Sequence, residues 1–257
     1  MRRIRRPKKV VKTPCSLKTK EGDIAFILAR SSGRRSLTIT VDEQAHVSVA
    51  SPFNMDERTI RAFIHEKARW IIAKVREAER DKDILSQKEF ADGQEFLFLG
   101  KKYPLNVIKA DVKRSRVVFD DDCGWSVFIP EPLPLEDAQK EIRHKMLKWY
   151  RHEAKEVLGG RIFHYSRLMG VVPKRIAIRT QKRVWGNCDY NTQTIHLNWQ
   201  IILSPPEVID YVLVHELCHL TIPSHSKRFW KKVGKFIPDY QVYRKWLKVN
   251  YLDMVLP

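Results

Sequence analysis

The segment SPPEVIDYVLVHELCHLTIPSH, from Ser204 to His225, constrains this chain most. It contains His215 and His219 four residues apart in an HExxH pattern, with Glu216 between them. Residues four apart lie on one face of an α-helix, so both imidazoles can bind one metal ion. Glu216 lies about 100° round the helix and remains free for proton transfer. The pattern therefore predicts a metal-binding helix that carries an acid–base carboxylate.

The residues around the motif favour a real helix. Ser204 is expected to be its N-cap, with prolines in the first turn and Glu207 completing a capping box. From Val208 to Ile222 only two residues carry a formal charge, and apolar residues occupy every side, as is typical of a buried helix. Two histidines and a glutamate are costly in such a helix unless a metal satisfies them. The alternative is a buried helix whose histidines only hydrogen-bond to their neighbours.

A third ligand has few sources in this chain. Downstream of His219 there is no glutamate, one histidine, His225, and two aspartates. This excludes the zincin class that takes a later glutamate as ligand. His225 follows His219 by six residues, the spacing of HExxHxxGxxH, although Ile222 replaces the glycine. Three neutral imidazoles would leave one position of a tetrahedral Zn²⁺ open for water, as in catalytic sites. The alternative role for His225 is a residue at the start of the next helix.

The rest of the chain predicts an α+β protein in three parts. Residues 1–20 carry nine Lys/Arg and no acidic residue, and we expect a disordered basic tail. Residues 21–132 are predicted to form a β-rich half with one long amphipathic helix, capped by Asn54. Prolines at 130, 132 and 134 mark a boundary. Residues 135–257 then predict a zincin-like catalytic domain, in which helices pack on a small mixed sheet.

Cysteine usage and hydropathy bear on the compartment. The four cysteines lack the spacing of a disulfide framework, which suits a reducing cytoplasm. Cys218 lies inside the HExxH motif but projects off the histidine line, and we expect a small buried hydrophobe. The chain has no apolar run long enough for a membrane span and no apolar secretory signal at its N-terminus. These features predict a cytoplasmic protein that does not contact membranes.

The net charge of +18 is unevenly distributed. Half of it lies in residues 1–20, and residues 227–248 hold eight Lys/Arg against one aspartate. The second block begins two residues after His225 and places positive potential near the predicted site. We expect both basic segments to contact nucleic acid or another polyanion. The alternative for the tail is a solubilising terminus.

Several segments together resemble the YgjP-like metal-dependent hydrolases, which are relatives of the SprT and WLM zincins. They are the HELCH helix with His225 beyond it, the following SKRFW, the preceding LNW strand and the WGNC loop. The resemblance is strongest over residues 135–257; SLTITVDEQAHVSVASP, EKARWIIAKV and FLGKKYPLNV extend it into the first half. It implies a zincin-like site in which His215, His219 and His225 bind the metal and Glu216 is the catalytic acid–base.

One loop departs from the family pattern. The family usually reads close to QKSRWGSC, whereas residues 181–188 read QKRVWGNC. Val184 therefore replaces the usual arginine, and Arg183 stands one position earlier. If the family's arginine contacts substrate, that contact is lost or re-routed in this chain.

The leading hypothesis is a zinc metallopeptidase that uses metal-activated water, although another divalent metal is possible. Arg183 or His196 could stabilise the developing oxyanion, and both have structural alternatives. One rival is a metal-dependent nucleotide phosphoanhydride hydrolase, favoured by the basic block at 227–248. A second rival is a nucleic-acid-binding module with a structural metal, which would be expected to have four protein ligands.

Overall fold

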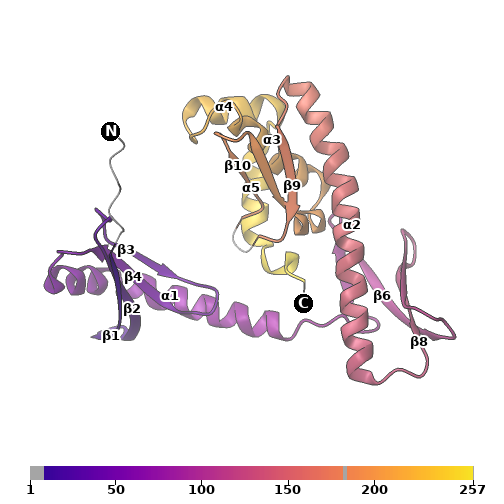
Figure 1. The fold of residues 1–257 in the computed structure, drawn as a ribbon, viewed down its shortest axis with the longest axis horizontal. Helices are drawn as coiled ribbons and strands as arrows, with labels where there is room; N and C mark the ends of the chain where they lie inside the picture. Colours follow the sequence, from indigo (N-terminus) through magenta and orange to yellow (C-terminus); the bar gives the residue numbers. More distant parts are fainter. Residues whose placement is uncertain (1–8, 182–183, 257) are drawn as a thin grey trace. The chain divides into compact units, whose positions relative to one another are not determined.

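The computed structural model describes residues 9–181 and 184–256 and confirms an α+β fold (Figure 1). The chain divides after Gln87 into two compact units. Across the described residues, each sheet combines parallel and antiparallel pairing, and helices cover the sheets. The observed division differs from the expected boundary at the proline-rich segment.

The first unit is a four-stranded sheet with one long helix. The strands lie in the order β1 (Val10–Thr19), β2 (Gly22–Ser31), β4 (Val47–Pro52) and β3 (Thr38–Val41). β2 and β4 are parallel, whereas the two outer pairs are antiparallel. Helix α1 (Glu57–Ser86) buries one stripe of apolar residues against this sheet. The stripe consists of Ile60, Ile64, Ala68 and Ile71.

Two expectations for this unit are wrong. Residues 10–19 of the expected tail form β1, because they pair with β2 along their whole length and bury Leu17; residues 1–8 lie outside the described residues. The N-cap of α1 is Asp56 instead of Asn54. The Asp56 carboxylate accepts a 2.8 Å hydrogen bond from the Thr59 amide, and its bonds with Thr59 lower the pKa of Asp56.

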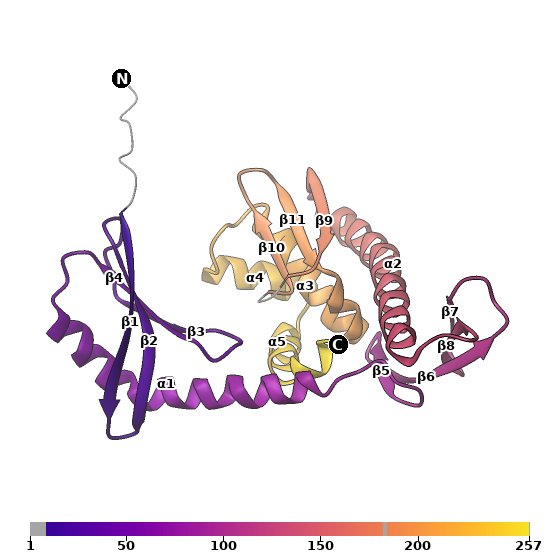
Figure 2. The same cartoon turned by 60° about the horizontal axis from the view of Figure 1, so that its bottom comes forward.

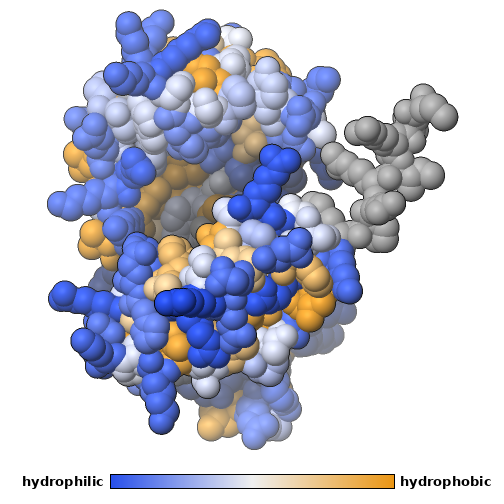
Figure 3. All heavy atoms as spheres, turned by 90° about the vertical axis from the view of Figure 1, so that its left-hand side faces the viewer, coloured by the Kyte–Doolittle hydropathy of each residue, from blue (hydrophilic) through white to orange (hydrophobic). Residues whose placement is uncertain are grey.

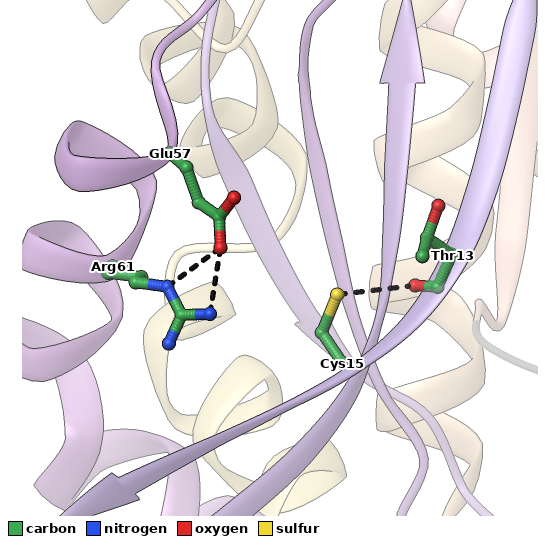
Figure 4. A network of polar contacts seen from close by, with 4 residues as sticks. All are labelled: Thr13, Cys15, Glu57 and Arg61. Carbon is green, nitrogen blue, oxygen red and sulfur yellow. Dashed lines mark hydrogen bonds and ion pairs between the residues drawn. The ribbon is translucent and has the colours of Figure 1, made fainter.

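Figure 4 shows local contacts in this unit. On α1, Arg61 donates two hydrogen bonds to Glu57, one turn earlier, at 2.9 and 2.7 Å. On β1, the Cys15 thiol contacts the Thr13 carbonyl oxygen at 3.7 Å. Glu57 lies in the first turn, where a negative charge interacts favourably with the helix dipole. The ion pair is exposed, so its contribution to stability is small.

The second unit begins with a sheet of the same topology. Its strands lie in the order β5 (Glu95–Phe98), β6 (Lys101–Ala110), β8 (Gly124–Pro130) and β7 (Arg116–Asp120). Helix α2 (Leu135–Met169) follows and remains continuous through its two glycines. Trp125 of β8 packs against Trp149 and Tyr150 of α2, with ring centroids 5.3 Å apart in both pairs. The proline-rich segment therefore connects two parts of one core, and the expected domain boundary there is wrong.

A three-stranded sheet and the C-terminal helices complete the second unit (Figure 2). The sheet has the order β10 (Gly186–Asp189), β11 (Thr194–Asn198) and β9 (Arg175–Arg179); β10 is antiparallel and β9 parallel to β11. The short 3₁₀ helix η1 (Trp199–Leu203) then leads into α3 (Pro206–His219). After α3 come α4 (Lys227–Phe236), α5 (Tyr240–Val249) and the 3₁₀ turn η2 (Leu252–Met254). β10 forms within a segment that was expected to be a loop.

Hydrophilic residues cover most of the face drawn in Figure 3, with hydrophobic groups interspersed. This agrees with a chain in which 30% of residues are charged. None of the helices in residues 9–181 and 184–256 is long and apolar enough to cross a membrane.

Candidate metal centre

Helix α3 carries the HExxH motif through the core of the second unit. Nine of its fourteen residues are buried, which confirms the predicted buried helix. Its start differs from the prediction: Pro205 is the N-cap and makes no side-chain cap bond. Ser204 instead ends η1, and its hydroxyl donates a 2.7 Å hydrogen bond to the Ile201 carbonyl oxygen. The hydroxyl is therefore used by the preceding 3₁₀ turn and does not cap α3.

Three histidine side chains, two from the last turn of α3 and one from the segment after it, converge on one point. The Nε2 atom of His219 lies 3.2 Å from that of His215 and 3.2 Å from that of His225. The Nε2 atoms of His215 and His225 are 3.0 Å apart. His225 reaches the other two because the chain turns back after α3, and Ser226 caps the start of α4. Among the described residues this is the one cluster of three or more possible metal ligands.

The spacing of the three nitrogens fits a tetrahedral metal. A Zn²⁺ ion bound by imidazoles at about 2.0–2.1 Å in tetrahedral geometry separates the nitrogens by about 3.3 Å. The observed separations of 3.0–3.2 Å are close to this value. Each Nε2 atom of a neutral imidazole is either a donor or an acceptor of a hydrogen bond. At least one of the three pairs therefore brings two donors or two acceptors together, a conflict that a shared metal ion removes. The donor set therefore fits a metal ion with a position open to solvent.

Burial keeps two of these histidines in the form that binds metal. Burial, together with the electrostatic effect of His219, His225 and Arg244, lowers the pKa of His215 to about 3. Burial also lowers the pKa of His219. The Nδ1–H of His219 is placed to donate to the Ile222 carbonyl oxygen, 3.0 Å away, which leaves the Nε2 lone pair for a metal. Both rings therefore offer a neutral imidazole at neutral pH.

Glu216 is a buried carboxyl group beside the histidines. Its relative exposure is 5%, and its Oε2 atom has no hydrogen-bond partner among the described residues. Burial raises the pKa of Glu216 to about 8. A carboxyl with this pKa can take and release a proton near neutral pH.

Strand β10 contacts the Glu216 side chain, a feature that the sequence reasoning missed. A Cβ atom added to Gly186 would lie 2.7 Å from Glu216 Cγ and 2.8 Å from Glu216 Oε1. The position therefore accepts only a glycine unless the carboxylate moves. The signal was available in the WGNC segment, where a glycine stands in a short strand and can mark a close approach of backbone to another group.

An aromatic wall supports the three imidazoles. Phe229 is fully buried and stacks on His219, with ring centroids 4.4 Å apart. Trp230 stacks on His225 at 5.6 Å and on Tyr240 at 5.0 Å. The guanidinium of Arg244 lies over the Trp230 ring, 5.3 Å from its centroid. The SKRFW segment thus supplies the packing that orients the histidines, a role that its sequence alone did not reveal.

Of the two candidate oxyanion donors, the structure describes only His196, and this residue does not lie beside the cluster. In β11 the residues that face Gly186 and Cys188 of β10 are Leu197 and Ile195. His196 lies between them in sequence and therefore points to the opposite face of the sheet, away from Glu216. Arg183 lies outside the described residues. The structure thus does not bring His196 together with the histidine cluster.

The nearby cysteines are not ligands in this arrangement. Cys218 is fully buried, as expected. Burial raises the pKa of Cys218 to about 11. Burial and the nearby charges of Glu216 and Asp189 raise the pKa of Cys188 to about 11. Both are therefore protonated thiols at neutral pH in the metal-free protein, and neither belongs to the cluster of possible metal ligands among the described residues.

The chain is similar to a known family of metallopeptidase domains. The family described as "YgjP-like, metallopeptidase domain" matches residues 35–250. No curated protein matches the chain. Among solved structures, the metallopeptidase zymogen of Pyrococcus abyssi abylysin is 23% identical, with a TM-score of 0.34, over 36% of this chain and 93% of that one. The family match covers most of the sequence, and this chain therefore belongs to the YgjP-like metallopeptidase domain family.

Proposed function

We propose that this metallopeptidase domain is a zinc-dependent hydrolase of peptide bonds. In this proposal His215, His219 and His225 bind the zinc ion, and Glu216 is the catalytic acid–base. Membership of the family supports the class of reaction. The observation that carries the residue assignment is the convergence of three Nε2 atoms within 3.0–3.2 Å, next to a buried carboxyl.

Zinc is the ion that this donor set suits best. Three imidazoles favour zinc over magnesium or calcium, which prefer oxygen ligands. When bound, zinc supplies Lewis-acid chemistry: it lowers the pKa of water to about 7 and polarises a carbonyl group. A structural zinc site would be expected to have four protein ligands, and three are present in the described cluster. This difference supports a catalytic role over a structural one.

Glu216 moves the protons of the reaction. Its carboxylate accepts a proton from the attacking water and then donates that proton to the nitrogen of the leaving amine. Burial, which raises the pKa of Glu216 to about 8, suits both steps. The Gly186 backbone holds the carboxylate from one side. The ring of Phe229 holds the imidazole of His219.

A second candidate is hydrolysis of a nucleotide phosphoanhydride. The observation that favours it is the basic start of α4, two residues beyond His225, where Lys227, Arg228 and Lys231 are exposed. These cations would suit the phosphates of a nucleotide. Contact of a polyanion with residues 227–248 or with the basic N-terminal segment remains a prediction.

The decisive experiment replaces Glu216 by Gln. We expect the zinc-loaded variant to retain about one zinc per chain, while its turnover of an unfolded protein such as casein falls at least about a hundredfold. The matched control is Glu207→Gln, which removes an exposed glutamate from the first turn of the same helix. This control should keep both its zinc and its turnover.

Parallel assays with casein and a panel of nucleoside triphosphates separate the two reactions. Peptide cleavage that depends on Glu216 supports the peptidase. Release of phosphate from a nucleotide, with casein left intact, would refute the peptidase proposal and support phosphoanhydride hydrolysis. Undiminished casein turnover in Glu216→Gln would refute the acid–base role.

A further inference from the structure

One face of α2 exposes only basic side chains over four turns. Between residues 140 and 155, every exposed residue is Lys, Arg or His, and the remaining residues are buried or half-buried. The exposed set is Lys140, Arg143, His144, Lys148, Arg151, His152 and Lys155. We call this surface the α2 cationic face. Within this range Glu141 and Glu153 are half-buried, and an exposed glutamate, Glu156, directly follows it.

The charges of this face are largely uncompensated within the chain. Lys140 makes an ion pair with Asp137 at 3.7 Å, and both side chains are more than half exposed. Arg143, Lys148, Arg151 and Lys155 make no ion pair with any residue that the structure describes. Like charges three or four residues apart destabilise a helix. The helix therefore carries a repulsion that an anionic partner would relieve.

The α2 cationic face has the shape of a linear binding surface. Its side chains and Leu147 line an open hollow of about 550 Å³. The sixteen residues from 140 to 155 are separated by fifteen helical steps of about 1.5 Å, so the face extends over about 22 Å. Arg151 is held in place because its guanidinium lies over the Trp199 ring, 5.5 Å from the centroid. The face thus presents a row of cations along part of the long helix α2 (Figures 1 and 2).

The chemistry of this row favours one class of partner. One strand of a nucleic-acid duplex carries a phosphate about every 3.4 Å of axis, so 22 Å holds about six phosphates. Five permanent cations along the same length provide matching charge. An amphipathic membrane helix needs an exposed apolar side, and residues 140–155 expose no apolar residue. Binding of single strands uses exposed aromatic platforms, and this face exposes no Phe, Tyr or Trp.

We propose that the α2 cationic face binds the phosphate backbone of double-stranded nucleic acid, without reading its sequence. The surface is distinct from the histidine cluster on α3 and from the basic block at 227–248. The proposal does not depend on peptidase activity.

The test uses the full chain and a fluorescein-labelled 30-base-pair duplex of arbitrary sequence, made as DNA and as RNA. Fluorescence anisotropy gives the dissociation constant from 50 to 300 mM salt. The test variant carries Arg143→Gln, Lys148→Gln and Lys155→Gln, and leaves Arg151 on Trp199. The matched control carries Arg69→Gln, Arg76→Gln and Lys82→Gln, which removes three exposed cations from the long helix α1.

We expect the wild type and the control to bind alike, with log Kd rising steeply with log salt. The test variant should lose about 2.7 from the magnitude of that slope, because each phosphate contact contributes about 0.9. Its affinity at 100 mM salt should fall at least about tenfold. The single variants Lys148→Gln and Lys155→Gln should each lose about 0.9 from the slope, which provides a reading if the triple variant does not fold.

Several results would overturn the proposal. Absence of duplex binding by the wild type, an unchanged slope in the test variant, or equal losses in the test and control variants would each do so. Binding of polyglutamate or anionic vesicles as tightly as the duplex would assign the face to another class of anionic partner. Equal binding of DNA and RNA duplexes supports recognition of the backbone, and exclusive binding of one defined sequence contradicts it.

Discussion

Replacement of Gly186 by alanine tests the contact between β10 and Glu216. The added methyl group would lie 2.7 Å from Glu216 Cγ, 2.8 Å from Oε1 and 3.0 Å from Cδ. Non-bonded carbon atoms are ordinarily about 3.5–4.0 Å apart. The Glu216 carboxyl must therefore move by roughly 0.8 Å or rotate away, because it is more flexible than the strand backbone.

The expected loss follows from this displacement. A misplacement of about 1 Å in a catalytic group can reduce turnover about a hundredfold, which corresponds to about 2.7 kcal/mol in the barrier. The three histidines do not contact the added methyl group among its three nearest atoms. We therefore expect Gly186→Ala to retain its zinc and to lose about two orders of magnitude in turnover.

The assay combines steady-state casein hydrolysis, zinc analysis and thermal unfolding. The matched control is Gly159→Ala, because an added Cβ at that helical position meets no atom within 4 Å. The control should keep full turnover, and its helix should gain about 0.5–1 kcal/mol. Full turnover in Gly186→Ala would refute the proposed contact. Parallel loss of zinc would show that β10 supports the ligands and not the carboxyl alone.

Three further predictions concern stability and metal binding. Burial raises the pKa of Glu216 from 4.5 to about 8; in metal-free protein its stabilising contribution is therefore complete below pH 4.5 and lost as the pH rises through 8. Urea unfolding of chelated Glu216→Gln should show a gain over wild type that grows from pH 5 to pH 9, and a constant difference would contradict this. Phe229→Ala should lower the free energy of unfolding by about 3–5 kcal/mol and weaken zinc binding, whereas the half-buried Phe236→Ala should cost less. Chelation should lower the melting temperature and added zinc should restore it, as expected for a ligand of the folded state; a melting temperature insensitive to both would argue against the histidine site.

Much of the histidine cluster could be predicted because its geometry is local. His215 and His219 lie on one helical face through the period of the backbone alone. The apolar residues around them indicated a buried helix, and nine of its fourteen residues are buried. His225 is only six residues further on, and its Nε2 atom lies within 3.2 Å of the other two.

The long helices and hairpins were also predictable, since their periodicity extends over many residues. The elements against which they pack were harder to predict. The proline-rich segment looked like a boundary, yet Trp125 on one side of it packs against Trp149 on the other. Proline composition reports local backbone preference and carries no information on which side chains share a core.

The sequence by itself predicted that the three histidines lie together, that Glu216 lies beside them, and that the fold is α+β. Each of these follows from the spacing of residues along one continuous backbone. Only the tertiary structure decided what surrounds them. The approach of Gly186 to Glu216 and the stacking of Phe229 on His219 join elements whose pairing depends on packing across the fold. The α2 cationic face likewise became visible only with the pattern of exposure along α2, in which Glu141 and Glu153 are half-buried. Contacts between distant segments depend on how whole surfaces fit together, which no local pattern specifies.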